Sequence, residues 1–128
     1  MLVAGLILAM VAGVIHVYIF VLESLRWTDP RTRAVFGTTE EQADMNRQLA
    51  FNQGFYNLFL AVGAVLGAIL VFAGRGTAGE TLTTTATASM VLAGLVLLLS
   101  DRTKLRAALV QVLAPALSLV ALLLAAVV

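Results

Sequence analysis

Four long apolar runs dominate this sequence, and each is long enough to cross a lipid bilayer as a helix. They cover about residues 2–24, 47–73, 80–100 and 104–128. A membrane-spanning helix needs about 20 apolar residues. Hydrocarbon offers the backbone no hydrogen-bond partners, so only helices and closed barrels span a membrane. The runs therefore predict an all-α integral membrane four-helix bundle, with residues 1–128 as a single transmembrane domain.

Composition excludes several classes of protein. The chain is 61% hydrophobic and 12% charged, whereas soluble domains carry about 25% charged residues. A net charge of +1 without a basic stripe argues against nucleic acid as a partner. The absence of cysteine excludes disulfides, thiolate metal sites and cysteine nucleophiles. The lipid bilayer is the partner that this composition predicts.

The basic residues predict an orientation. Seven of them flank the first and third connections between the runs, and Arg75 alone lies in the second. Lys and Arg accumulate on the cytoplasmic side of a membrane. The long connection, about residues 25–46, is therefore expected in the cytoplasm and both termini outside. The first run has no basic residue before it, so we expect a retained helix rather than a cleaved signal peptide.

Two connections carry local signals. Thr38 or Thr39, followed by two glutamates and Gln42, indicates a capped helix start. From there the helix is expected to continue into the second span. Residues 74–79 contain three glycines and predict a flexible turn before the third span.

Polar side chains enter the second span at its first turns. Residues 49–61 include Asn52, Gln53, Tyr56 and Asn57. Polar groups in hydrocarbon are costly unless they find partners or water. We therefore expect other helices to face this block with polar groups of their own.

The first and fourth runs supply such groups. His16, Phe20, Glu23 and Trp27 share one face of a helix. Gln111 lies near the start of the fourth run. By their distance from the flanking charges, these residues reach similar depths in the cytoplasmic half. The sequence thus predicts one polar pocket, formed by three helices.

The function this pattern favours is acid–base catalysis on a lipophilic small molecule. An ionisable residue inside a span indicates function by default. No cofactor is expected, because cysteine, nucleotide-binding loops and metal-ligand spacings are all absent from the sequence. Isomerisation, cyclisation or epoxide opening would fit, since each needs mainly proton transfer. The candidate catalytic residues are His16, Glu23 and Tyr56, and the candidate substrate-binding residues are Asn52, Gln53, Asn57, Gln111, Trp27 and Phe20; no metal ligands are expected.

Other interpretations stay open. The polar residues can act only as interhelical hydrogen-bonding groups, which would make the chain a structural or partner-binding subunit. A small-molecule transporter is a further alternative, but four helices are too few for an inverted repeat, so a homo-oligomer would be needed. Haem held by His16 is the least supported alternative, because one histidine is a weak signal.

The same residues carry a family resemblance. The sequence resembles the small bacterial four-helix membrane proteins of domain-of-unknown-function family 1304, which implies a location in the bacterial cytoplasmic (inner) membrane. Leu95–Val96 departs from that pattern, which has a Tyr-Gly pair there, and Gln111 and Pro115 are spaced more widely than in the family. The resemblance implies a fold and a set of polar positions, but no activity. Its motifs are His16-x-Tyr18-Ile19, Glu23, Trp27-Thr28-x-Pro30, Phe36-Gly37, Leu49-Ala50-x-Asn52-Gln53-Gly54-x-Tyr56-Asn57-x-Phe59-Leu60-Ala61, Ala93-Gly94, Gln111 and Pro115-Ala116.

Overall fold

A computed structural model describes residues 1–127, and over those residues the chain is helical almost throughout, with no strand. Four helices in it are long and apolar enough to cross a membrane, which confirms the predicted fold class. The elements in order are α1 (Leu2–Phe20), the π-helical turn η1 (Val21–Leu25), α2 (Pro30–Phe36), α3 (Glu40–Phe72), α4 (Gly76–Ser100), the 3-10 turn η2 (Arg102–Lys104) and α5 (Leu105–Val127).

The start of α3 agrees with its sequence signal, and the start of α4 does not. Thr39 caps α3 with Gln42 in a reciprocal capping box, and the helix runs unbroken to Phe72, as expected. The predicted glycine turn is shorter than residues 74–79, because α4 already begins at Gly76. Of these glycines only Gly74 has a positive φ, of 80°. The predicted fourth span ends on residue 128, which lies outside the described residues.

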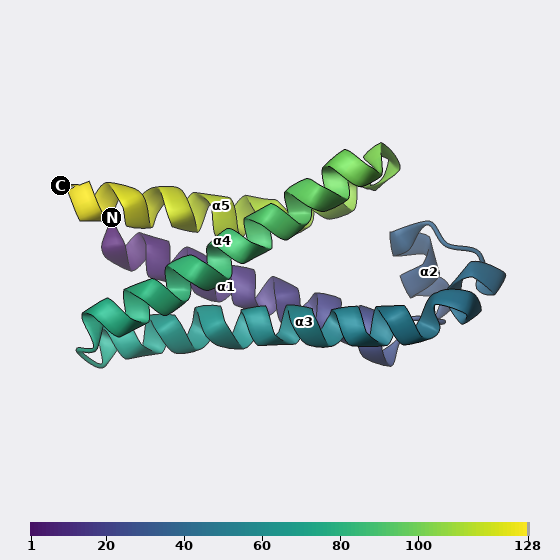
Figure 1. Ribbon diagram of the computed structural model, residues 1–128, viewed down its shortest axis with the longest axis horizontal. Helices are drawn as coiled ribbons and strands as arrows, with labels where there is room; N and C mark the ends of the chain where they lie inside the picture. The colour runs from purple at the N-terminus through teal and green to yellow at the C-terminus, as the bar shows by residue number, and fades with distance from the viewer. Residues whose placement is uncertain (128) are drawn as a thin grey trace.

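The four long helices form a ring in which each packs against two neighbours. α1 packs against α3 and α5, and α4 packs against the same two helices. Figure 1 shows both termini at one end of the bundle, beside the turn between α3 and α4. We call this the terminal end. The opposite end carries α2 and the turn between α4 and α5, and we call it the basic end.

Every seam of the ring contains a glycine in close contact with the next helix. A Cβ on Gly67 of α3 would lie 2.6 Å from the Thr83 nitrogen of α4, and one on Gly5 of α1 would lie 2.9 Å from the Leu122 side chain of α5. Gly13 and Gly94 approach α3 and α5 in the same way. Lipid provides no hydrophobic drive between helices, so close backbone approach and van der Waals packing hold them together.

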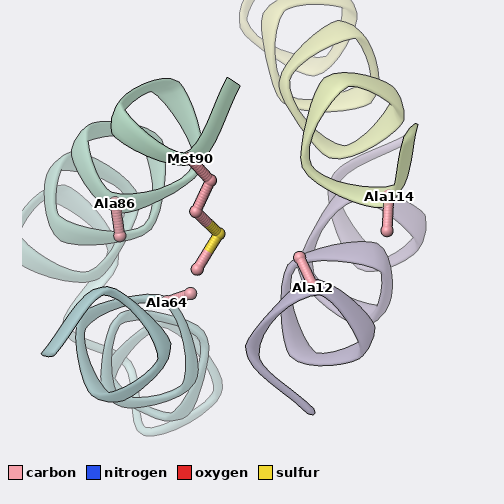
Figure 2. Packing of buried hydrophobic residues seen from close by; sticks show 5 residues of the cluster. All are labelled: Ala12, Ala64, Ala86, Met90 and Ala114. Carbon is pink, nitrogen blue, oxygen red and sulfur yellow. The ribbon is translucent and has the colours of Figure 1, made fainter. Parts of the chain in front are cut away.

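Small side chains also fill the centre of the ring. Figure 2 shows Met90 of α4 extending toward the middle of the four helices. An alanine from each helix completes this layer: Ala12, Ala64, Ala86 and Ala114. The flexible thioether fills the space that these alanines leave.

The connection at the basic end folds back onto the bundle. The Trp27 indole donates from Nε1 to the Ala43 carbonyl at 2.9 Å, and its ring centroid lies 5.2 Å from that of Phe36. Lys104, in η2, donates to the Phe36 carbonyl. The connection therefore links α1, α3 and the turn between α4 and α5.

Candidate functional site

Glu23 lies in the π-helical turn at the end of α1 and is only 7% exposed. Its Oε2 accepts a hydrogen bond of 2.8 Å from Nδ2 of Asn57 on α3. The same amide nitrogen donates to the Gln53 carbonyl at 3.2 Å. The carboxylate is therefore fixed in position by the neighbouring helix.

Close contact between α1 and α3 places the two side chains together. Gly54 has no Cβ, which allows the Ser24 nitrogen to come within 3.0 Å of the position that a Cβ would occupy. The Ser24 hydroxyl donates to the Phe51 carbonyl at 2.8 Å. These contacts set the register in which Asn57 faces Glu23.

An open cleft of about 510 Å³ lies beside the carboxylate at the basic end. It separates the end of α1 from the first turns of α3. Glu23, Asp44 and Arg47 bring charge to it, and Trp27 and Phe51 bring aromatic rings. The remaining lining residues are Ser24, Leu25, Thr28, Met45 and Gln48. A small molecule in this cleft would lie against Glu23.

His16 is fully buried and uses only one of its ring nitrogens. Nδ1 lies 2.9 Å from the Ala12 carbonyl, four residues earlier on α1. A carbonyl only accepts, so Nδ1 carries the proton and Nε2 of a neutral ring is an acceptor. Nε2 is buried and has no partner among the described residues. Most buried polar atoms in proteins have a partner, so this free acceptor is notable.

Asn57 lies between the levels of His16 and Glu23. His16 and Glu23 are seven residues apart, about 10 Å along a helix. Gly13 of α1 faces Ala61 of α3, and Asn57 is one turn from Ala61 toward the basic end. The three polar side chains are thus ordered by depth along the bundle, and of the three only Glu23 lines the cleft.

Three residues of the predicted pocket lie elsewhere. Asn52 and Gln53 are exposed, and Tyr56 is 68% exposed. The expectation that the whole block points into one interior pocket is wrong for these three. They occupy the outer face of α3, whereas the inner face carries Ala50, Gly54, Asn57, Ala61 and Ala64. That spacing of small residues was the signal for the inward face.

The other predicted residues are distributed around the site. Trp27 is half-buried and lines the cleft. Phe20 is half-buried and packs edge-on against Phe55, with ring centroids 5.1 Å apart. Gln111 is half-buried on α5 and does not line the cleft. The polar groups at the carboxylate thus come from α1 and α3, rather than from three helices.

Sequence reasoning missed one wall of the cleft. Asp44, Arg47, Gln48 and Phe51 follow one another on α3 at spacings of three, one and three residues. This spacing places them on one face of a helix. The spacing was detectable in the sequence, but no role was predicted for these residues.

Over the described residues, no three His, Cys, Asp or Glu side chains are grouped so as to hold a metal ion.

Comparison with known proteins gives one positive result. No curated protein and no solved structure matches the chain. A family model described as "Protein of unknown function (DUF1304)" matches residues 9–123, and the chain therefore belongs to that family.

Proposed function

We propose that this multi-pass membrane protein catalyses cofactor-free proton transfer on a lipophilic small molecule. The reaction is an isomerisation, a cyclisation or an epoxide opening. The substrate enters the cleft at the basic end from the membrane surface. The observation that carries the proposal is the Glu23 carboxylate, held inside a span by Asn57 and lining an open cleft.

Glu23 acts as the group that takes and returns the proton. Its Oε2 is held by Asn57, and among the described residues no hydrogen bond reaches Oε1. In an isomerisation the carboxylate removes a proton from one carbon, and the resulting acid returns it to another. No external reagent is needed. A positioned acid or base contributes typically 10²–10⁴-fold to a rate.

His16 supplies a second acceptor deeper in the bundle. Among residues 1–127 its Nε2 has no hydrogen-bond partner, and the Nδ1 hydrogen bond to Ala12 fixes the ring. A hydroxyl of a substrate that reaches past Asn57 would satisfy this nitrogen. Asn52, Gln53 and Tyr56 face outward, and the proposal gives them no chemical step.

Deuterium labelling tests the proposal without a known substrate. The purified protein in lipid nanodiscs is incubated in D₂O with a lipid-soluble cell extract, and mass spectrometry compares the products. We expect at least one compound to gain deuterium with the wild type and not with Glu23→Gln. His16→Leu should reduce the same labelling.

The control is Glu80→Gln, which removes an exposed carboxylate at the terminal end and should leave labelling unchanged. Circular dichroism establishes that each variant is folded. If the wild type neither labels nor converts any compound above the Glu23→Gln background, the catalytic proposal fails; conversion is scored as well because an epoxide opening puts deuterium only on oxygen, where it exchanges.

A structural role is the second candidate, because the same contacts tie α1 to α3. Glu23, Ser24 and Trp27 each make a hydrogen bond to α3. If locking the helices is their only role, Glu23→Gln lowers the thermal stability and does not change the deuterium labelling of any compound. The labelling and stability measurements together separate the two functions.

We also propose that the protein resides in the bacterial cytoplasmic membrane with its basic end in the cytoplasm. The distribution of Lys and Arg supports this orientation. The chain has no cysteine, so single-cysteine labelling has no background. In intact cells, a membrane-impermeant maleimide should label Thr77→Cys at the terminal end and spare Thr28→Cys. The reverse pattern would invert the orientation.

A further inference from the structure

Glu23 has no positively charged partner in the described part of the chain. The ion pair present there joins Arg33 to Glu40 at 3.6 Å, at the basic end and away from Glu23. Asn57 supplies a single hydrogen bond to the carboxylate. Removing a carboxylate from water is costly unless it is paired. A cation supplied by a ligand would provide the missing partner.

We propose that the cleft binds the cationic amine group of a lipophilic amine, with the nitrogen placed against Glu23. The inference rests on the proposed function, because the same carboxylate serves both, and it names the substrate class. The cationic nitrogen pairs with the carboxylate, which thereby gains the charged partner that the described residues do not supply.

Aromatic rings support a cationic ligand. Trp27 and Phe51 line the cleft together with Glu23. The hydrogen bond from Trp27 Nε1 to Ala43 holds the indole in place. An ammonium group is attracted to the face of a tryptophan or phenylalanine ring, and more strongly when water is excluded. A carboxylate beside two rings is therefore suited to a positively charged nitrogen.

The remaining lining residues fit the rest of such a molecule. Leu25 and Met45 are exposed apolar side chains at the cleft. They offer a surface to a hydrocarbon chain that continues into the bilayer. Asp44 balances the charge of Arg47, so the ionised cleft retains the net negative charge of Glu23. A negatively charged ligand would have to depend on Arg47 alone.

Tryptophan fluorescence gives a direct binding assay, because Trp27 is the only tryptophan in the chain and lines the cleft. The protein in nanodiscs is titrated with octylammonium, octanol and octanoate, which share a chain and differ in charge. We expect octylammonium to change the fluorescence saturably, at a concentration at least tenfold lower than octanol. Glu23→Gln should abolish this difference, and Glu80→Gln should leave it intact.

The other outcomes separate the two proposals. Equal responses to octylammonium and octanol would overturn the amine inference and leave catalysis on a neutral substrate standing. A preference for octanoate that disappears in Arg47→Gln would also overturn it. No response to any probe would remove the cleft as a binding site and with it both proposals. The wild-type comparison decides the charge preference even if Glu23→Gln does not fold.

Discussion

The two halves of the bundle are built differently. Toward the terminal end, α3 and α4 meet through backbone at Gly67 and Gly79. The buried hydroxyls there are all bonded, as with Thr83 to the Gly79 carbonyl at 2.9 Å and Ser118 to the Gly5 carbonyl at 2.8 Å. Toward the basic end, side-chain hydrogen bonds of Glu23, Ser24 and Trp27 join the end of α1 to α3. They border a cleft of about 510 Å³, larger than the cavity of about 150 Å³ at the terminal end.

Unsatisfied polar atoms follow the same division. Over the described residues, three buried side-chain atoms have no partner: His16 Nε2, Arg33 Nε and Thr38 Oγ1. All three belong to the basic half. Proteins break the rules of packing and polar satisfaction mainly at functional sites. The fully bonded packing thus lies in the terminal half, and the unsatisfied atoms lie in the half that contains the candidate site.

The largest effect is expected from filling the terminal seam. In Gly67→Val a Cβ would lie 2.6 Å from the Thr83 nitrogen and 2.8 Å from the Gly79 oxygen, and backbone atoms cannot rotate away. We expect loss of the folded protein or destabilisation by about 3 kcal/mol or more. Gly63→Ala is the control, because its Cβ would meet only side-chain carbons, Ala86 Cβ at 3.3 Å and Leu82 Cδ1 at 3.8 Å. Thermal unfolding in detergent measures both, and equal stability of the two variants would contradict the packing argument.

The next effect comes from breaking the bond between Asn57 and Glu23. Asn57→Leu leaves the buried carboxylate without its donor, which costs about 2–4 kcal/mol. Glu23→Gln keeps a side chain that can still bond and should cost less. Denaturant unfolding of both single variants and the double variant gives the coupling energy. Additive effects would show that the two side chains do not stabilise each other.

His16→Leu should behave unlike an ordinary core substitution. It removes a buried nitrogen that has no partner and a hydrogen bond to its own helix. We expect the free energy of unfolding to change by less than about 1 kcal/mol, or to increase, since an unmet polar group is removed. A loss of several kcal/mol would show that the imidazole is structural.

Sequence patterns predicted the fold better than the site. Four apolar runs and the Thr39 capping box were sufficient for the helices, because lipid permits few alternatives. The face of α3 was harder to assign. Asn52 is as polar as Asn57, but burial of small residues beside α1 decides which of them turns inward. The π-helical turn at Glu23 and the contact between Ser24 and Gly54 depend on tertiary packing, which hydrophobic periodicity does not encode.

A smaller effect is expected from Ser118→Ala in the terminal half. Its hydroxyl donates to the Gly5 carbonyl across the seam between α5 and α1. Interhelical hydrogen bonds in membranes average about 0.6 kcal/mol. We expect a loss of that size by thermal unfolding, well below the effect of Asn57→Leu. A larger loss for Ser118→Ala than for Asn57→Leu would contradict the division between the two halves.

The smallest effect concerns the turn at the basic end and depends on pH. The Thr103 hydroxyl and amide both donate to Asp101, and these hydrogen bonds lower the pKa of that carboxyl from its ordinary value of 3.8. Because the folded pKa is lowered, the contribution to stability is present above pH 3.8 and disappears as the pH falls through the lowered pKa. NMR of the Thr103 amide should therefore show a titration midpoint below 3.8 in the wild type and none in Asp101→Asn. A midpoint at or above 3.8 would show that the hydrogen bonds from Thr103 do not favour the ionised Asp101 carboxylate. They would then not stabilise the turn between α4 and α5.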